Sequence, residues 1–386
     1  MNTISNRKAM FFIFLLGIVS LFADMTYEGA RSITGQYLAI LGATGTTVGI
    51  VAGLGELIGY GFRLVSGYIS DKTGKYWFIT FTGYIINLLA VPLLALADHW
   101  SLAAVLIVME RFGKAIRTPA RDAMLSYATQ QTGRGWGFGL HEAFDQIGAV
   151  LGPLIVSAFL YYQGSYQMSF AMLLIPAICA LCVLVCARIL YPHPRDLEIK
   201  NLIPKKDQLS KNYWLYIIAV SCVAAGYMDF PLIALHFEKM DMIPKAWIPI
   251  FFAIAMGADG ISALIFGRIY DYKGISILIF VTLLSSFFVP FVFLNGFYLP
   301  LLGIILWGIG IGSQESIMRA VVADLVPIEK RGTAYGILNA WFGIFWFFGS
   351  ALMGFLYDFS LTALLIFSFG IQLVAIPFLL LLKKNK

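Results

Sequence analysis

Long apolar segments alternate with short polar ones along the whole chain. The first apolar run begins at Ala9, and further runs centre near residues 58, 87, 110, 148, 178, 225, 258, 285, 311, 345 and 371. At about 1.5 Å per helical residue, each run is long enough to cross a hydrocarbon core of about 30 Å. The pattern therefore predicts an all-α membrane protein with twelve transmembrane helices.

The composition favours lipid as the solvent of this chain. Hydrophobic residues make up 60% of its 386 residues and charged residues 12%, whereas a soluble domain carries about 25% charged residues. A chain of this size cannot hide so much apolar surface from water. The four cysteines lie in apolar segments, and we expect them to serve in packing rather than in disulfides.

A short charged turn between two apolar runs recurs in the second half of the chain. Residues 67–75 read GYISDKTGK, and residues 267–274 read GRIYDYKG, 200 positions later. A second matched pair opens the fifth and eleventh runs, at residues 134–140 and 331–337, with an offset of 197. Two matches at nearly one offset indicate two parallel copies of one unit. We predict an N-terminal half over 1–190, a linker over 191–211 and a C-terminal half over 212–386.

The paired turns, in their place between apolar runs, resemble the loop signature of the major facilitator superfamily of secondary transporters. The resemblance covers essentially the whole chain. It implies two pseudo-symmetric six-helix halves, alternating access around a central cavity, and a cytoplasmic gate at the paired turns. The gate residues expected on this basis are Gly67, Asp71, Lys72, Gly74, Lys75, Gly267, Asp271 and Gly274. Tyr76 departs from the further basic residue usual in the family.

Basic residues gather in one set of predicted loops, in the 191–211 linker and in the C-terminal tail. Outside the linker and the tail, the loop residues are Lys72, Lys75, Arg117, Arg121, Arg134, Lys273, Lys330 and Arg331. Because cytoplasmic loops of membrane proteins carry an excess of Lys and Arg, we predict that both termini and the linker are cytoplasmic. The expected location is a cell membrane, of the bacterial cytoplasmic (inner) type.

Ionisable residues inside the apolar runs are the candidate site, because a charge in hydrocarbon costs at least a few kcal/mol. Asp24, Glu28 and Arg31 are spaced four and three apart, so they share one helical face. Two acids against one arginine leave a carboxylate without a partner in this helix, which favours function over a purely structural salt-bridge lattice. The proton-coupling and cavity candidates are Asp24, Glu28, Arg31, Glu56, Arg63, Glu110, Arg111, Glu142, Asp145, Asp229, Asp259, Glu315 and Arg319.

Within this set, we predict that a proton moves chiefly through Asp24, Glu28 and Asp145. We expect Arg31 and Arg111 to neutralise acids of the first or fifth helix. The second half holds fewer ionisable residues, so proton handling is expected in the N-terminal half and substrate contacts in both. Competition between substrate and proton for one carboxylate would give an antiporter, and joint binding would give a symporter. Sodium coupling or uniport would replace the proton mechanism if transport ignored the pH gradient.

Three residues of the fifth run, Gly148, Gly152 and Pro153, resemble the antiporter motif of the superfamily, G-x-x-x-G-P-x-x-G-G. Val156 and Ser157 replace its final glycine pair. The same residues also suit an ordinary packing seam between helices. The resemblance favours proton-coupled export of a small organic or amphiphilic solute. Proton-coupled uptake is the alternative, and a non-transporting sensor or assembly partner with a transporter fold is the alternative of another class.

No phosphate-binding loop, nucleotide fingerprint, metal motif or hydrolase elbow occurs in a credible context. We therefore expect neither an enzyme nor an ATP-driven pump, and no cofactor or metal. The net charge of +6 is attributed to membrane orientation rather than to nucleic-acid binding. We expect a monomer whose partners are a small-molecule substrate, protons and the lipid bilayer.

Overall fold

A computed structural model describes residues 3–132, 134–193, 210–326 and 331–384, and all regular elements in these ranges are helical. The chain packs as two compact units. Unit 1 comprises Met1–Arg31 and Gly61–Leu202, and unit 2 comprises Ser32–Tyr60 and Ile203–Lys386. The boundaries thus fall inside the first two helices as well as near the linker. The division into residues 1–190 and 212–386 stays a prediction.

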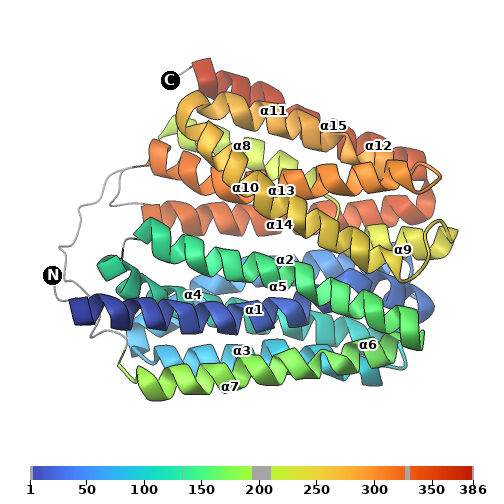
Figure 1. The fold of residues 1–386 in the computed structure, drawn as a ribbon. Helices are drawn as coiled ribbons and strands as arrows, with labels where there is room; N and C mark the ends of the chain where they lie inside the picture. The colour runs from blue at the N-terminus through green and yellow to red at the C-terminus, as the bar shows by residue number, and fades with distance from the viewer. Residues whose placement is uncertain (1–2, 133, 194–209, 327–330, 385–386) are drawn as a thin grey trace. The chain divides into compact units, whose positions relative to one another are not determined.

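Unit 1 contains the first part of the first helix, the last part of the second helix, and the helices that follow up to the linker. Its helices are α1 (Thr3–Ile40, in part), α2 (Gly45–Thr73, in part), α3 (Tyr76–Leu93), the 3-10 turn η1 (Leu94–Leu96), α4 (Trp100–Thr132), α5 (Arg134–Gln163), α6 (Tyr166–Met172) and α7 (Leu174–Leu190). Helix α3 packs against α4 on one side and α7 on another, and α3 and α7 lie side by side in Figure 1.

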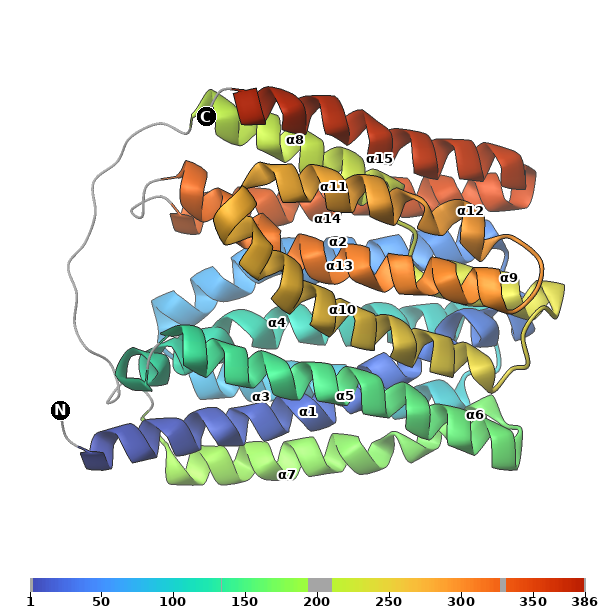
Figure 2. The ribbon, with the colours of Figure 1, turned by 45° about the horizontal axis from the view of Figure 1, so that its top comes forward.

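Unit 2 contains the remaining parts of α1 and α2 and the helices that follow the linker. These are α8 (Lys211–Gly226), α9 (Phe230–Met240), α10 (Trp247–Lys273), α11 (Ile275–Ser286), α12 (Phe288–Val292), α13 (Tyr298–Leu325), α14 (Arg331–Phe359) and α15 (Leu361–Lys384). Helices α8 and α15 run side by side (Figure 2), and α10 packs along α13.

The twelve predicted membrane crossings are present in the described residues. Eleven segments are long and apolar enough to span a membrane; three of these join two short helices, α6 with α7, α8 with α9, and α11 with α12. The twelfth is α4, whose 33 residues carry too many charges for an apolar span. Its charged residues include Glu110, Arg111, Lys114, Arg117 and Arg121.

Two basic residues assigned to a loop from the sequence, Arg117 and Arg121, lie inside α4, so that assignment is wrong. The reason is tertiary. Arg117 is 1% exposed and donates from Nη1 to the Tyr84 hydroxyl at 3.0 Å, and Arg121 donates from Nη1 to the Ser20 hydroxyl at 3.1 Å. Each guanidinium group thus donates a hydrogen bond to a hydroxyl of a neighbouring helix. Arg134 is the first residue of α5.

The repeated charged turns have the same backbone geometry in both copies. Gly74 follows α2 with φ 66° and its N–H donates to the Ser70 carbonyl at 2.8 Å; Gly274 follows α10 with φ 55° and donates to the Tyr270 carbonyl at 2.8 Å. A glycine with positive φ directly after the last helical residue is common at helix C-termini, because glycine adopts this conformation without steric cost. Asp71 therefore lies in the last turn of α2 rather than in the connecting turn.

Candidate functional site

The acidic face of α1 is buried in unit 1. Asp24 is 4% exposed and Glu28 7% exposed. The Glu28 Oε1 atom lies 3.8 Å from the Lys114 Nζ atom of α4, and its Oε2 atom lies 3.9 Å from Nη1 of Arg31 on its own helix. Glu28 is thus held between two cations, one of which belongs to another helix. This is the neutralisation expected of Arg31.

Lys114 and Arg117 are cationic side chains of α4 beside this cluster. The Lys114 Nζ atom lies 4.0 Å from the centroid of the Tyr27 ring, and the Arg117 Cζ atom lies 4.3 Å from that of Tyr84. A cation over an aromatic face is favoured most where water is excluded. The sequence analysis did not select Lys114. Its spacing of three and seven residues from Arg117 and Arg121 places all three near one helical face, which is the signal that could have identified it.

Asp24 lies where α1 meets α5. A Cβ at Gly148 would contact the Leu21 carbonyl and the Asp24 Cβ, and a Cβ at Gly152 would contact the Met25 backbone. The glycine pair therefore sets a close contact between the two helices, and whether it also acts as an antiporter motif stays a prediction. Pro153, buried beside Gly152, lies inside α5.

The Asp24 Oδ2 atom is buried and has no hydrogen-bond partner in the described part of the chain. The charges that act most strongly on Asp24 are those of Asp145, Lys114 and Arg117. Asp145 in turn lies 3.5 Å from the Nδ1 atom of the buried His141, measured to Oδ1. Asp24, Glu28 and Asp145, the three predicted proton carriers, thus belong to one electrostatic cluster.

Glu110 extends the cluster toward α3. Its Oε2 atom lies 3.3 Å from Nε of Arg111, and its Oε1 atom accepts a hydrogen bond from Nδ2 of Asn87 at 2.7 Å. Arg111 thus pairs with its chain neighbour, and Lys114 contacts Glu28 of the first helix. Whether Arg111 also neutralises an acid of the first or fifth helix stays a prediction. Asn87 reaches Glu110 because Gly83 and Gly113 allow the α3 and α4 backbones to meet closely.

A third ion pair lies further along α4. The Arg121 Nη2 atom lies 2.8 Å from the Asp122 Oδ1 atom. Asp122 is also within electrostatic range of His141 and of the predicted candidate Arg63, which is half-buried. Charged groups therefore follow one another along α4 from the buried Glu110 to Asp122, whose side chain is 43% exposed.

Unit 2 holds one of its buried aspartates, Asp229, in a different way. Asp229 is 2% exposed and lies at the break between α8 and α9. Its Oδ2 atom accepts hydrogen bonds from the Trp346 indole Nε1–H at 2.9 Å and from the Ser350 hydroxyl at 2.7 Å. The Trp307 indole donates to the Met228 carbonyl at 2.8 Å, so the broken backbone also has partners. A discontinuous membrane helix needs such partners.

The remaining predicted candidates are Glu56, Glu142, Asp259, Glu315 and Arg319. Glu56 and Asp259 are buried in unit 2, whereas Glu142 and Glu315 are exposed. Arg319 lies in α13, but its side chain is outside the described part. A Cβ at Gly312 would contact Asp259, so this aspartate sits at the close contact of α13 with α10.

Of the gate residues, Asp71, Lys72 and Lys75 are exposed, and so is Asp271. The Asp71 Oδ1 atom accepts a hydrogen bond from the Tyr76 hydroxyl at 3.3 Å. Their glycines adopt the matching turns described above, and a Cβ at either Gly67 or Gly267 would find ordinary contacts only, with Pro119 and Ser316. The gating role of these residues stays a prediction.

The buried cluster of unit 1 brings the carboxylates of Asp24 and Glu28 within electrostatic range of Lys114. A change of charge in such a cluster would alter helix packing, because an ion pair in a low-dielectric interior is held by strong Coulomb attraction. No group of three or more His, Cys, Asp or Glu with metal-site geometry occurs among the residues that the structure describes.

Comparisons with known proteins identify a family and a fold. The model of the Major Facilitator Superfamily matches residues 9–314. An uncharacterized protein of Mycobacterium tuberculosis is 39% identical over 372 residues, which is 95% of this chain and 91% of the relative. The multidrug resistance protein MdtH of Proteus mirabilis is 32% identical over 128 residues, 33% of this chain and 32% of MdtH. The crystal structure of the nucleoside transporter NupG shares the fold, with a TM-score of 0.73, 15% identity, and coverage of 97% of this chain and 100% of NupG.

Proposed function

The chain belongs to the major facilitator superfamily, and we propose that it is a secondary active transporter that exports a small organic or amphiphilic solute in exchange for protons by alternating access. The superfamily consists of multi-pass membrane transporters. Direction, coupling ion and solute class are the parts that we propose.

The proposed proton coupling rests on one observation, the surroundings of Glu28 and Asp24. Glu28 lies between Lys114 and Arg31, one helical turn from Asp24, whose Oδ2 atom has no hydrogen-bond partner in the described residues. Burial without compensation favours the neutral form of a carboxyl group, and a nearby cation favours the charged form. A movement of α4 relative to α1 that changes the distance to Lys114 would therefore bind or release a proton.

Export is supported by two features. The segment from Gly148 to Pro153 resembles an antiporter motif, and a third of the chain is similar to a protein named for multidrug resistance. Proton-coupled uptake is the second candidate, since the same cluster could bind proton and substrate together. A non-transporting sensor would have little use for a cluster of buried ion pairs, which disfavours that class.

Transport into proteoliposomes decides among these functions. Candidate solutes are screened with an imposed pH gradient, and each active solute is retested after an ionophore collapses the gradient. Inward proton flow that expels solute supports antiport, and entry of both supports symport. Transport that is the same with and without the gradient would remove the proton mechanism and leave sodium coupling or uniport.

The matched turns supply the proposed cytoplasmic gate. Asp71→Asn keeps the size of the side chain and removes its charge, so transport should fall while folding and membrane insertion persist. Asp98→Asn, an exposed aspartate after η1, serves as the matched control. Wild-type turnover in Asp71→Asn would mean that the charged turn only helps to set membrane orientation and takes no part in gating.

We place the termini and the linker in the cytoplasm of a bacterial-type cell. Lys205→Cys, in the part of the linker outside the described residues, tests this in a background without the four native cysteines. An impermeant thiol reagent added to intact cells should leave this cysteine unmodified, and modification from outside would reverse the assigned orientation.

A further inference from the structure

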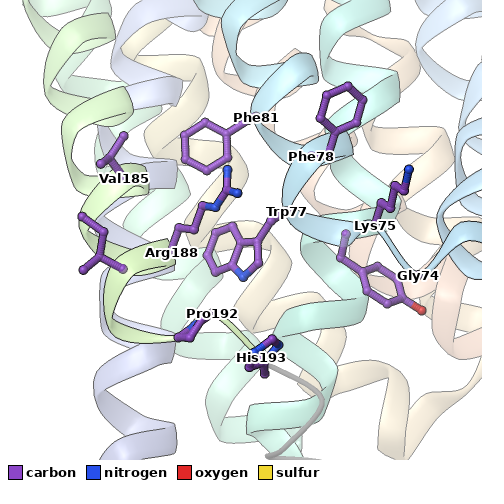
Figure 3. A pocket seen from close by; sticks show the side chains of 11 residues that line it. Gly74, Lys75, Trp77, Phe78, Phe81, Val185, Arg188, Pro192 and His193 are labelled. Carbon is purple, nitrogen blue, oxygen red and sulfur yellow. The ribbon is translucent and has the colours of Figure 1, made fainter.

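A hollow of about 940 Å³ lies at one end of unit 1, between the start of α3 and the end of α7 (Figure 3). Its lining combines aromatic rings, among them Trp77 and Phe81, with the basic side chains of Lys75, Arg188 and His193. No carboxylate belongs to this lining in the part of the chain that the structure describes. The hollow thus combines apolar walls with positive charge alone.

The hollow lies where one candidate membrane span begins and another ends, which is where a membrane–water interface is expected. The apolar span of α3 begins at Tyr76, and the span that contains α7 ends at Leu190. The Trp77 indole Nε1–H donates to the Tyr191 carbonyl at 3.0 Å, and the Tyr191 ring lies 4.9 Å from that of Phe12. Tryptophan and tyrosine concentrate at the headgroup level of bilayers. A ligand here would therefore meet headgroups and acyl chains together.

The basic side chains of the hollow are available to an anion. The Arg188 Cζ atom lies 5.5 Å from the centroid of the Phe81 ring, and Figure 3 shows Arg188 on one side of Trp77 and Lys75 on the other. Within the described residues, neither Arg188 nor Lys75 forms an ion pair with a carboxylate. A guanidinium group suits a phosphate because its N–H groups can donate two parallel hydrogen bonds.

The apolar part of the wall faces outward. Phe78 is 68% exposed, and Ile189 is 72% exposed. A soluble anion would gain nothing from these side chains, whereas an acyl chain could lie along them. We propose that this hollow binds the headgroup of an acidic phospholipid, with its phosphate at Arg188, additional attraction from Lys75, and an acyl chain along Phe78 and Ile189.

Lipid titration of the purified full-length protein in detergent, read by native mass spectrometry, tests this site. The probes are phosphatidylglycerol and phosphatidylcholine with identical acyl chains. Phosphatidylglycerol should bind with the lower Kd, by about five-fold for each contributing cation. Arg188→Gln should remove most of this preference, Lys75→Gln a smaller part, and Arg188→Lys should retain much of it.

Lys72→Gln is the matched control, because Lys72 is exposed near the same turn but does not line the hollow. Its lipid preference should equal that of the wild type. Equal Kd values for the two lipids, or an equal loss in Lys72→Gln and Arg188→Gln, would overturn the proposal. Displacement of phosphatidylglycerol by inorganic phosphate alone would assign the site to a soluble anion and would overturn it as well.

Discussion

Units 1 and 2 bury acidic side chains in different surroundings. Glu28 of unit 1 lies 3.8 Å from Lys114 and 3.9 Å from Arg31, at distances longer than a good hydrogen bond. Asp229 of unit 2 accepts two hydrogen bonds, from the Trp346 indole and the Ser350 hydroxyl, at 2.9 and 2.7 Å. The first arrangement places a carboxylate between two cations, which is the basis of the proposed proton coupling. The second fixes a helix break with neutral donors.

The difference is also visible in the repeat. At the offset of 197 residues, Lys114 corresponds to Ile311 and Asp145 to Phe342. At these two positions the second copy carries apolar side chains, although it holds Asp229, Asp259, Glu315 and Arg319 elsewhere. This difference supports the proposal that proton handling lies in the first copy.

The largest expected effect follows from neutralising the carboxylates of unit 1. A gradient of one pH unit supports a solute ratio of about ten for one proton per solute. This ratio is measured in proteoliposomes for Asp24→Asn, Glu28→Gln and Asp145→Asn. The variant that lacks the coupling carboxylate should reach a ratio of only about one. Exchange of solute across the membrane without a gradient should persist in that variant, because exchange needs no net proton step. Full accumulation in all three would contradict the assignment.

A large loss of stability is expected from Lys114→Met. Removing one partner of a buried ion pair leaves an uncompensated charge and costs about 3–5 kcal/mol. The double variant Lys114→Met with Glu28→Gln should recover part of the loss. Lys245, whose side chain is 59% exposed and 2.9 Å from Glu238, is the control. Lys245→Gln should cost at most about 1 kcal/mol. Thermal unfolding in detergent measures both, and a smaller effect for Lys114→Met than for Lys245→Gln would contradict the buried cluster.

A moderate loss is expected at the contact of α1 with α5. Gly148→Ala places a Cβ against the Leu21 carbonyl and should cost about 1–3 kcal/mol. Gly139→Ala, on the same helix with nothing within 4 Å of its added Cβ, should be neutral or stabilise by up to about 1 kcal/mol. The two variants are compared by thermal unfolding. Similar stability of both would mean that the glycine pair does not hold the helices together.

The smallest effect is expected from the conservative variant Asp229→Asn. In Asp229→Asn the remaining carbonyl oxygen can still accept from Trp346 and Ser350, so unfolding should change by less than about 1 kcal/mol and proton-driven accumulation should persist. Asp229→Ala leaves two buried donors without an acceptor and should cost about 1–3 kcal/mol for each. A loss of coupling in Asp229→Asn would remove the contrast between the two units.

The number of membrane helices and the repeat could be predicted from the sequence, because apolar runs and left-handed glycines are local signals. Gly74 and Gly274 show this, since both adopt the same turn at the predicted positions. The acidic face of α1 could also be predicted from the sequence, because Asp24 and Glu28 are one helical turn apart on a strongly apolar segment.

The partners of that face could not be read from the sequence. Lys114 and Arg117 lie on a helix whose charges interrupt its apolar run. Arg117 was therefore predicted to lie in a loop. Their burial depends on Tyr27 and Tyr84, which come from other helices and contact these cations only in the folded chain. The helix break at Asp229 had one local signal in the sequence, the nearby Pro231. The hydrogen bond that Asp229 accepts from the Trp346 indole is a tertiary contact and had none.

Proton movement per transported solute tests the central claim most directly. Lightly buffered proteoliposomes are loaded with an identified solute, and solute flux and external pH are recorded together for the wild type, Asp24→Asn, Glu28→Gln, Asp145→Asn and Asp229→Asn. The account predicts about one or more protons exchanged per solute in the wild type and in Asp229→Asn, and none in at least one of the three unit 1 variants. Unchanged proton movement in all three unit 1 variants, or its loss in Asp229→Asn alone, would contradict the placement of proton coupling in unit 1.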